Sequence, residues 1–239
     1  MKLFCYDTVS STSDLARELA KEGAPHLTAV LARSQTVGRG RQGRVFLSPE
    51  GGTYVSIVLR PRLSPADYGL ITPLAAVALH KALFALTGID TAIKWVNDLL
   101  YHGKKVAGIL AESGRDATGA PFVILGIGVN TGPVLPSEIT DIAATVPFGD
   151  PKALATRVTE ELSLLLDSLP AVDWLTYYKS HAAMLGSPIT VMAGGSVRTA
   201  TALDVLADGA LLVAYENGER EALRGGEITV RPLAPSDGM

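Results

Sequence analysis

The sequence contains little cysteine, few aromatic residues and little charge. Its single cysteine among 239 residues is Cys5, which excludes an intramolecular disulfide and a cysteine-rich zinc site. We expect Cys5 to lie as a small apolar side chain in a first strand, and this cysteine usage is typical of the reducing cytoplasm. The N-terminus becomes polar too early for a signal peptide. No apolar run reaches the roughly 18 residues of a membrane span, so we expect a cytoplasmic protein without membrane contact.

Aromatic residues make up 6% and charged residues 19% of the chain, and the net charge is −3. Proteins that bind nucleic acid over their surface are usually basic, so this balance disfavours that class. Hydrophobic residues reach 47%, which is enough for a sizeable core and unlike a disordered chain. The length is compatible with one large domain or with one large and one small domain, and we place two domains at residues 1–185 and 186–235.

Helix and strand patterns fill the larger domain. Strands are expected at residues 2–7, 28–34, 53–60, 91–95, 99–101, 104–112 and 121–130. Helices are expected from Ser11 to Gly23, from Thr72 to about Leu86 with Gly88 just past the end, from Pro151 to about Leu165 with Asp150 as the cap, and over about 173–184. Between two of the strands, His102-Gly103 is a two-residue hairpin signal.

The pattern changes near Gly186. Short apolar pieces at 189–192, 197–205, 210–215 and 221–223 alternate with Gly-Gly, Asp-Gly and Asn-Gly turns. This pattern predicts a small β-barrel appended to the larger domain.

The segment Gly38 to Arg44 alternates three arginines with three glycines just after an expected strand. Glycine allows a ligand to approach main-chain N–H groups, and each arginine adds a fixed fork of donors with a permanent positive charge. Such a loop can surround an anion. A flexible surface turn and a nonspecific nucleic-acid-binding segment are the alternatives that this stretch alone leaves open.

Three further segments offer polar groups at the ends of expected elements. Ser11-Thr12-Ser13 begins the first helix and can cap it or bind a polar head group. Lys94 to Asp98 follows a strand, where Asn97 and Asp98 can also simply build the turn. Lys104 and Lys105 stand before a run of small residues, which could place a lysine ammonium in a shallow cleft. The alternative is that both lysines are solvated in a hairpin. Glycines inside the strand 121–130 indicate close approach of a ligand or of another backbone.

In this order, the segments closely resemble the catalytic domain of the biotin–protein ligases. The resemblance is carried by Ser11-Thr12-Ser13, Gln35 to Arg44, Lys94 to Asp98, Lys105 to Leu110, Gly126 to Asn130 and Gly225-Gly226-Glu227-Ile228. It implies an α+β fold, with a mixed central sheet flanked by helices as in class II synthetases and a small C-terminal SH3-like β-barrel. It also implies the monofunctional form, because the expected first strand begins at about residue 2 and leaves no room for an N-terminal DNA-binding domain. We therefore expect no binding to DNA.

The family resemblance implies a two-step reaction. The biotin carboxylate attacks the α-phosphate of ATP, with Mg²⁺ on the phosphates, to give biotinyl-5′-AMP. A lysine of a biotin carboxyl carrier domain, part of a biotin-dependent carboxylase, then takes the biotinyl group and AMP leaves. A homodimer is compatible with the family. A lipoate or octanoate ligase of the same fold is the alternative function.

The resemblance also implies residue roles. The catalytic residues would be Lys105, Arg41 and Arg39, with Lys105 bridging the biotin carboxylate and the α-phosphate. The biotin-binding residues would be Ser11, Thr12, Ser13, Gln35, Arg39, Gly40, Arg41, Lys105 and Gly108, with Gly126 and Gly128 leaving room for the rings and tail. The nucleotide-binding residues would be Arg41, Phe46, Lys94, Trp95, Asn97, Asp98 and Asn130. No side chain is assigned as a metal ligand.

Three residues depart from the family pattern. Ser13 stands where asparagine is usual, Val96 where proline is common, and Phe46 where many members carry tryptophan. Serine keeps a donor and an acceptor on a shorter side chain. Phenylalanine can still stack on adenine, although it has less area and lacks the N–H. None of these departures removes a group that the chemistry needs.

Overall fold

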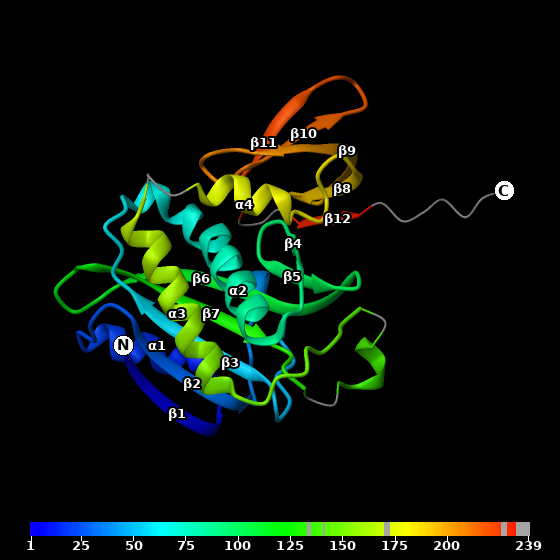
Figure 1. Cartoon of the computed structure of the whole chain (residues 1–239). Coiled ribbons are helices and arrows are strands. Elements are labelled where there is room, and N and C mark those ends of the chain that lie inside the picture. Colours follow the sequence, from blue (N-terminus) through cyan, green and yellow to red (C-terminus); the bar gives the residue numbers. More distant parts are fainter. Residues whose placement is uncertain (133–134, 141, 170–172, 226–228, 233–239) are drawn as a thin grey trace.

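A seven-stranded mixed sheet forms the centre of the protein in the computed structural model, which describes residues 1–132, 135–140, 142–169, 173–225 and 229–232 (Figure 1). The strand order is β1-β2-β3-β7-β6-β5-β4. The strands are β1 (Lys2–Val9), β2 (Thr28–Gln35), β3 (Thr53–Leu59), β4 (Ala92–Lys94), β5 (Asp98–Tyr101), β6 (Lys104–Arg115) and β7 (Pro121–Val129). β1 runs parallel to β2, whereas the other neighbours pair antiparallel. The α+β class expected from the sequence is confirmed.

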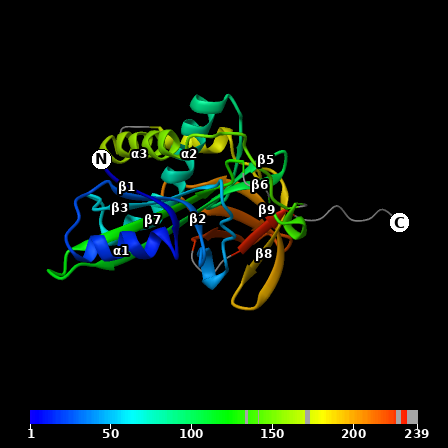
Figure 2. The same ribbon diagram turned by 90° about the horizontal axis from the view of Figure 1, so that it is seen from below.

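Helices cover both faces of this sheet, as Figure 2 shows with α1 on one side and α2 and α3 on the other. The helices are α1 (Thr12–Lys21), α2 (Ile71–Thr87), α3 (Pro151–Asp167) and α4 (Trp174–Ser180). Because successive strand residues point to opposite faces, β2 and β3 supply both cores. Val30 and Val58 pack against Ala16 and Ala20 of α1, while their apolar neighbours along the two strands face the larger core.

The caps expected from the sequence are present. The Ser11 side chain accepts a hydrogen bond from the Asp14 N–H at the start of α1, and Asp150 does the same for Ala153 in α3. Gly88 ends α2 in the left-handed conformation. The hairpin turn is also confirmed, since His102 and Gly103 both have positive φ. The fourth helix is shorter than expected and ends at Ser180.

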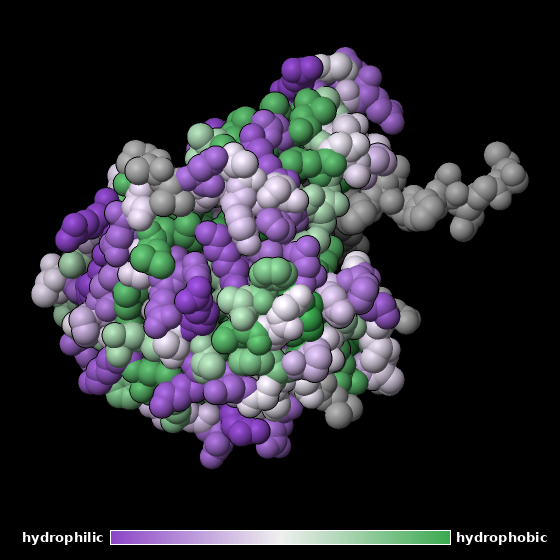
Figure 3. Space-filling model, viewed as in Figure 1, coloured by the Kyte–Doolittle hydropathy of each residue, from purple (hydrophilic) through white to green (hydrophobic). Residues whose placement is uncertain are grey.

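Two expectations from composition need correction. Cys5 lies in β1 as predicted, but its side chain is exposed, because β1 is the edge strand of the sheet. Within residues 65–87, which comprise a 3₁₀ turn (Pro65–Leu70) and α2, an 18-residue window has a mean hydropathy of 1.6, and this stretch suffices by length and composition to cross a membrane. This stretch is instead mostly buried against the sheet and α3, as a core helix is. Over the face with α2 and α3, polar and apolar residues are interspersed (Figure 3).

A second, five-stranded antiparallel sheet follows near the C-terminus. Its order is β11-β10-β9-β8-β12. The strands are β8 (Pro188–Ala193), β9 (Ser196–Val205), β10 (Leu211–Tyr215), β11 (Arg220–Leu223) and β12 (Thr229–Pro232). Four were expected, whereas β12 was missed because Thr229-Val230-Arg231-Pro232 is too short and polar to signal a strand without its partner β8. The expected match at Gly226-Glu227-Ile228 lies outside the described residues, and the division of the chain at residues 185 and 186 stays a prediction.

Trp95 joins the two sheets. Its buried indole N–H donates to the Gly209 carbonyl at 3.0 Å. Replacing Trp95 with phenylalanine leaves that carbonyl without its donor and should lower the free energy of unfolding by about 1–3 kcal/mol. Chemical denaturation measures this change. Trp174→Phe is the matched control, because Trp174 is equally buried at 6% exposure and its indole makes no hydrogen bond within the described residues. Equal losses in the two variants would show that lost volume alone is responsible.

Candidate functional site

A narrow cavity of about 50 Å³ opens between the Gly/Arg loop (Gly38–Arg44) and strands β6 and β7. The loop contributes arginines, Phe46 just after it contributes an aromatic ring, α1 contributes hydroxyls, and the strands contribute glycines. The lining residues are Thr12, Ser13, Gln35, Arg39, Gly40, Arg41, Phe46, Asn97, Lys105, Gly108, Ile109, Leu110, Gly126, Ile127 and Gly128. Segments far apart in the sequence therefore meet in one place, as expected for a binding site.

The base of this cavity is made of glycine. Gly108 of β6 lies directly opposite Gly128 of β7 in the register of the sheet. A Cβ atom on Gly128 would come within 2.4 Å of the Phe46 ring, and one on Gly108 within 2.9 Å of the same ring. The missing side chains thus create a hollow that a flat apolar group fills, and in this structure that group is Phe46.

One end of the cavity is a network of hydroxyl and amide groups. Gln35 Oε1 accepts hydrogen bonds from the Thr12 N–H at 2.8 Å and from the Thr12 hydroxyl at 3.0 Å. The Ser56 hydroxyl lies 2.8 Å from that of Thr12 and 3.0 Å from that of Ser13. Sequence reasoning missed Ser56, although a lone serine among the apolar and aromatic residues that follow Thr53 in β3 was a usable signal. The network offers both donors and acceptors to a polar ligand.

The Gly/Arg loop has an ordered turn at its centre. Gln42 and Gly43 adopt the left-handed conformation within a 3₁₀ turn (Arg41–Gly43), and the Gly40 N–H donates to the Arg44 carbonyl at 2.7 Å. A Cβ on Gly38 would lie 2.3 Å from the Phe46 carbonyl oxygen, so only glycine fits there. The turn directs Arg39 and Arg41 toward the cavity.

Arg39, Arg41 and Lys105 line the same cavity, as the sequence predicted. Arg39 pairs with Asp14 at 2.8 Å and with Glu112 at 3.1 Å. Lys105 Nζ lies 2.7 Å from Asp98 Oδ1 and 5.5 Å from the centre of the Phe46 ring. Arg39 is thus held in position by carboxylates, and Lys105 by a carboxylate and by the negative face of an aromatic ring.

Arg41 is partly buried in the site. Its guanidinium donates to Asn97 Oδ1 at 3.0 Å, and Asn97 in turn donates to the Ile109 carbonyl at 3.1 Å. Burial lowers the pKa of Arg41 from its usual value, and Asp98 acts in the opposite direction. Arginine stays charged despite such a shift because its reference pKa is so high. A fixed positive charge therefore sits in a partly desolvated place, where it attracts an anion strongly.

A buried oxygen in this region lacks a well-directed partner. Asp98 Oδ1 is close enough to Lys105 to pair as an ion, yet it makes no hydrogen bond of acceptable geometry within the described part of the chain. Such an oxygen can accept a further donor or a cation. The site therefore has capacity for a ligand beyond its own side chains.

Several predicted site residues lie outside the cavity lining. Ser11 is buried and caps α1, which favours the capping interpretation of that hydroxyl. Trp95 joins the two sheets, and Lys94 ends β4. Asn130 follows β7 and donates to the Ala144 carbonyl at 3.0 Å, which fastens the segment after it. Their roles toward a nucleotide stay predictions.

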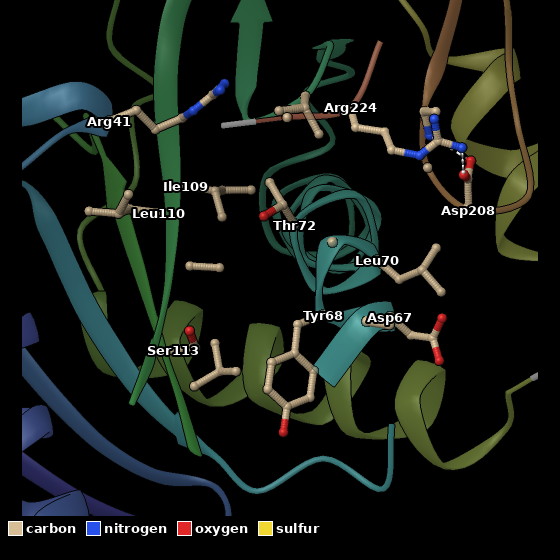
Figure 4. A pocket seen from close by; sticks show the side chains of 18 of the residues that line it. Arg41, Asp67, Tyr68, Leu70, Thr72, Ile109, Leu110, Ser113, Asp208 and Arg224 are labelled. Carbon is tan, nitrogen blue, oxygen red and sulfur yellow. Dashed lines mark hydrogen bonds and ion pairs between the residues drawn. The ribbon is translucent and has the colours of Figure 1, made fainter. Parts of the chain in front are cut away.

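A second, larger cavity of about 660 Å³ adjoins the first and shares Arg41, Ile109 and Leu110 with it. Figure 4 shows Arg41 reaching into it from one side, while the ion pair of Arg224 and Asp208 borders the other. It lies between β6, the start of α2 and the C-terminal sheet. The two cavities thus meet at Arg41.

Comparison with known proteins agrees with this geometry. Residues 5–130 match the biotin/lipoate A/B protein ligase family, and residues 184–231 match the biotin protein ligase C terminal domain. The chain belongs to the biotin/lipoate A/B protein ligase family. The first match covers the first seven strands of the protein, including the whole glycine-lined cavity, and the second covers the C-terminal sheet.

Relatives in this family span most of the chain. The bifunctional ligase/repressor BirA of Bacillus spizizenii is 34% identical over 228 residues, which cover 90% of this chain and 70% of the relative. The biotin–[acetyl-CoA-carboxylase] ligase of Paracoccus denitrificans is 36% identical over 179 residues, covering 69% of this chain and 75% of the relative. Among solved structures, biotin protein ligase from Aquifex aeolicus in complex with biotin and ATP has a TM-score of 0.82 at 28% identity, covering 97% of this chain and 99% of that one.

The glycines at the base of the smaller cavity lead to a prediction about ligand affinity. Gly128→Ala places a methyl group where the Phe46 ring now lies, so ring and ligand must compete for less space. One carbon in a close-fitting pocket typically changes discrimination by about 10–200-fold, and we expect at least about a 10-fold loss of biotin affinity by calorimetry. Gly149→Ala is the control, since its Cβ meets nothing within 4 Å. Unchanged affinity in Gly128→Ala would place the ligand elsewhere.

Proposed function

We propose that this protein is an ATP-dependent biotin–protein ligase. It activates biotin as biotinyl-5′-AMP and transfers the biotinyl group to a lysine of a carrier protein. The observation that carries this proposal is the shared cavity, in which two arginines and a lysine surround a glycine-based hollow with a hydroxyl network at one end. The family match and the Aquifex aeolicus complex with biotin and ATP support it.

Biotin has a polar ring system, an apolar tail and a carboxylate, and the cavity offers a matching series of groups. The hydroxyls of Thr12, Ser13 and Ser56 would bind the ring carbonyl and N–H groups. Gly108 and Gly128 would leave room for the rings and tail, which requires Phe46 to leave its present position. The carboxylate would then lie among the cations at the other end.

Activation joins two anions, so it depends on positioning and on charge. A carboxylate oxygen attacks the α-phosphorus, the bond to the β-phosphate oxygen breaks, and pyrophosphate leaves with the electron pair. Lys105 and Arg41 would neutralise the charge that builds up on the α-phosphate and hold the reactants in line. Asp98 and Asn97 would act as positioning residues, because they hold Lys105 and Arg41 respectively.

Mg²⁺ fits the same place. It prefers oxygen ligands and commonly binds through one or two carboxylates together with substrate phosphates. The Asp98 carboxylate supplies such an oxygen, and Lys105, which pairs with Asp98 Oδ1 at 2.7 Å, would move toward the phosphates when the ion binds. When bound, the ion would neutralise phosphate charge, and we propose Asp98 as its protein ligand.

The second step needs access for a protein. The acceptor amine attacks the carbonyl of the mixed anhydride, the bond to the phosphate oxygen breaks, AMP leaves, and the amine loses its proton. We propose that the carrier lysine enters through the larger cavity, because it opens between two sheets and meets the first cavity at Arg41. By this proposal the partner is a biotin carboxyl carrier domain. The cytoplasm as location, homodimer formation and the absence of DNA binding stay predictions.

The decisive test is transfer of biotin to an apo carrier domain, detected by mass spectrometry. We expect one biotinyl group on one lysine, and no product when ATP or Mg²⁺ is omitted. Lipoate and octanoate in place of biotin test the alternative ligase function. Faster transfer of either acid than of biotin would overturn the proposal.

A further inference from the structure

Two histidines and an aspartate gather outside the linings of both cavities. His80 is on α2, Asp90 lies in the connection between α2 and β4, and His181 follows the end of α4. One possible ligand atom from each residue lies within 4.8 Å of those of the other two. The imidazole rings of His80 and His181 are 4.2 Å apart between centroids. The proposed ligase chemistry uses none of these side chains.

The proton on His181 can be placed from its surroundings. Its Nδ1 atom lies 2.8 Å from the Tyr177 carbonyl oxygen, which can only accept, and 3.0 Å from the Ser180 hydroxyl, whose own hydrogen goes to that same carbonyl. Nδ1 therefore carries the hydrogen, and Nε2 of the neutral ring is left with a free electron pair. A carbonyl that fixes the tautomer in this way is the usual outer partner of a metal-bound histidine.

His80 is oriented in a similar manner. Its ring is buried, with Nε2 at 2.9 Å from the Asp90 carboxylate and Nδ1 at 2.9 Å from the Tyr177 hydroxyl. That hydroxyl can either donate or accept, so it can take the Nδ1 hydrogen if Nε2 gives up its own. A neutral imidazole is the form that binds metals.

We propose that His80, Asp90 and His181 form a binding site for a divalent transition-metal ion such as Zn²⁺. Two imidazole nitrogens and one carboxylate oxygen are a three-ligand set that zinc accepts, with water completing the tetrahedron. Imidazole ligands disfavour Mg²⁺ and Ca²⁺, which prefer oxygen. The Nε2 atoms of both histidines would bind the ion, and the side-chain hydroxyl and main-chain carbonyl of Tyr177 would hold the two Nδ1 hydrogens.

The position of the cluster implies a structural consequence. His181 also accepts a hydrogen bond at its carbonyl from the Ile93 N–H at 2.7 Å, and Ala183 donates to the Ile93 carbonyl at 2.9 Å. The chain after His181 leads directly into β8. An ion at this place would therefore join α2 to the segment that connects the two sheets, and it would stabilise the folded chain.

The test is a titration of the metal-free full-length protein with ZnCl₂, followed by calorimetry and thermal unfolding. We expect one ion per chain and, at about 100 times the Kd, a rise in Tm of roughly 5–10 °C. Asp90→Asn and His181→Gln should remove this binding. Tyr177→Phe, which keeps all three ligands, should weaken it by about 10–100-fold. Co²⁺ provides a spectroscopic probe, because a tetrahedral site has characteristic visible absorption.

His102→Asn is the matched control, since it removes a histidine from an exposed turn whose positive φ asparagine tolerates. This variant should bind Zn²⁺ as the unchanged protein does. The proposal is overturned if no ion binds, if His102→Asn loses binding as much as His181→Gln does, or if His181→Gln and Asp90→Asn leave the affinity unchanged. In each of those cases the cluster is only a hydrogen-bonded link between α2 and α4.

Discussion

Replacing Lys105 with alanine is expected to slow biotinyl-adenylate formation by about 10²–10³-fold, the usual effect of losing one electrostatic contact to a developing charge. The Lys105 ammonium lines the glycine-based cavity and lies 2.7 Å from Asp98, which holds it where, by the proposed mechanism, the carboxylate and the α-phosphate meet. Its removal leaves the phosphate charge without a neutralising group at that point. Single-turnover measurement of adenylate formation separates this loss from effects on the transfer step.

The neighbouring residue supplies a matched control. Lys104 carries the same charge, but its ammonium donates to the Thr140 carbonyl at 2.8 Å and lies outside both cavities. Lys104→Ala should therefore form adenylate at the normal rate, and both variants should unfold at similar temperatures. Near-normal adenylate formation in Lys105→Ala would mean that another residue neutralises the α-phosphate.

Replacing Arg41 with glycine is expected to release biotinyl-5′-AMP into solution. The Arg41 guanidinium lies where the two cavities meet, and its hydrogen bond to Asn97 fixes it there. A charged hydrogen bond of this type contributes about 1.5–3 kcal/mol, so the adenylate should dissociate about 10- to 100-fold faster. The free mixed anhydride would then modify lysines on bystander proteins, which mass spectrometry of an added unrelated protein detects.

Arg44→Gly is the control for the loop. Arg44 is exposed, its side chain donates to Gln42, and it lines neither cavity. Loss of this side chain should not cause bystander modification. A slow Arg41→Gly enzyme that retains its adenylate would assign Arg41 a role in the chemical step alone.

Much of the site could be predicted from residue types and their order. Arg39, Gly40 and Arg41 of the Gly/Arg loop were expected together with Thr12, Gln35, Lys105 and Gly108, and all of these line one cavity. Their signal was local, because each stands next to a recognisable strand or helix end. The same local reasoning found the caps Ser11 and Asp150 and the turn at His102-Gly103.

Other contacts could not be predicted from the sequence, because they join residues that are distant in the chain. Ser56 contacts Thr12 and Ser13 across more than 40 positions. Phe46 was expected beside the nucleotide, and the structure places its ring over Gly108 and Gly128. Trp95 was expected in the nucleotide site, which stays a prediction, and its indole donates to the Gly209 carbonyl in the turn between β9 and β10. No spacing in the sequence encodes these pairs.

The sequence by itself determined the chemistry, because charge, donor geometry and the absence of a side chain are properties of single residues. The cationic side chains of Arg39, Arg41 and Lys105 and a set of strand glycines indicate that the place where they come together binds an anion with a flat apolar part. Only the tertiary structure decided that they meet, which carboxylate or amide holds each cation, and that His80, Asp90 and His181 converge at a second place. The physical reason is that side-chain contacts across the sheet depend on strand order and register, and these are set by the packing of the whole core.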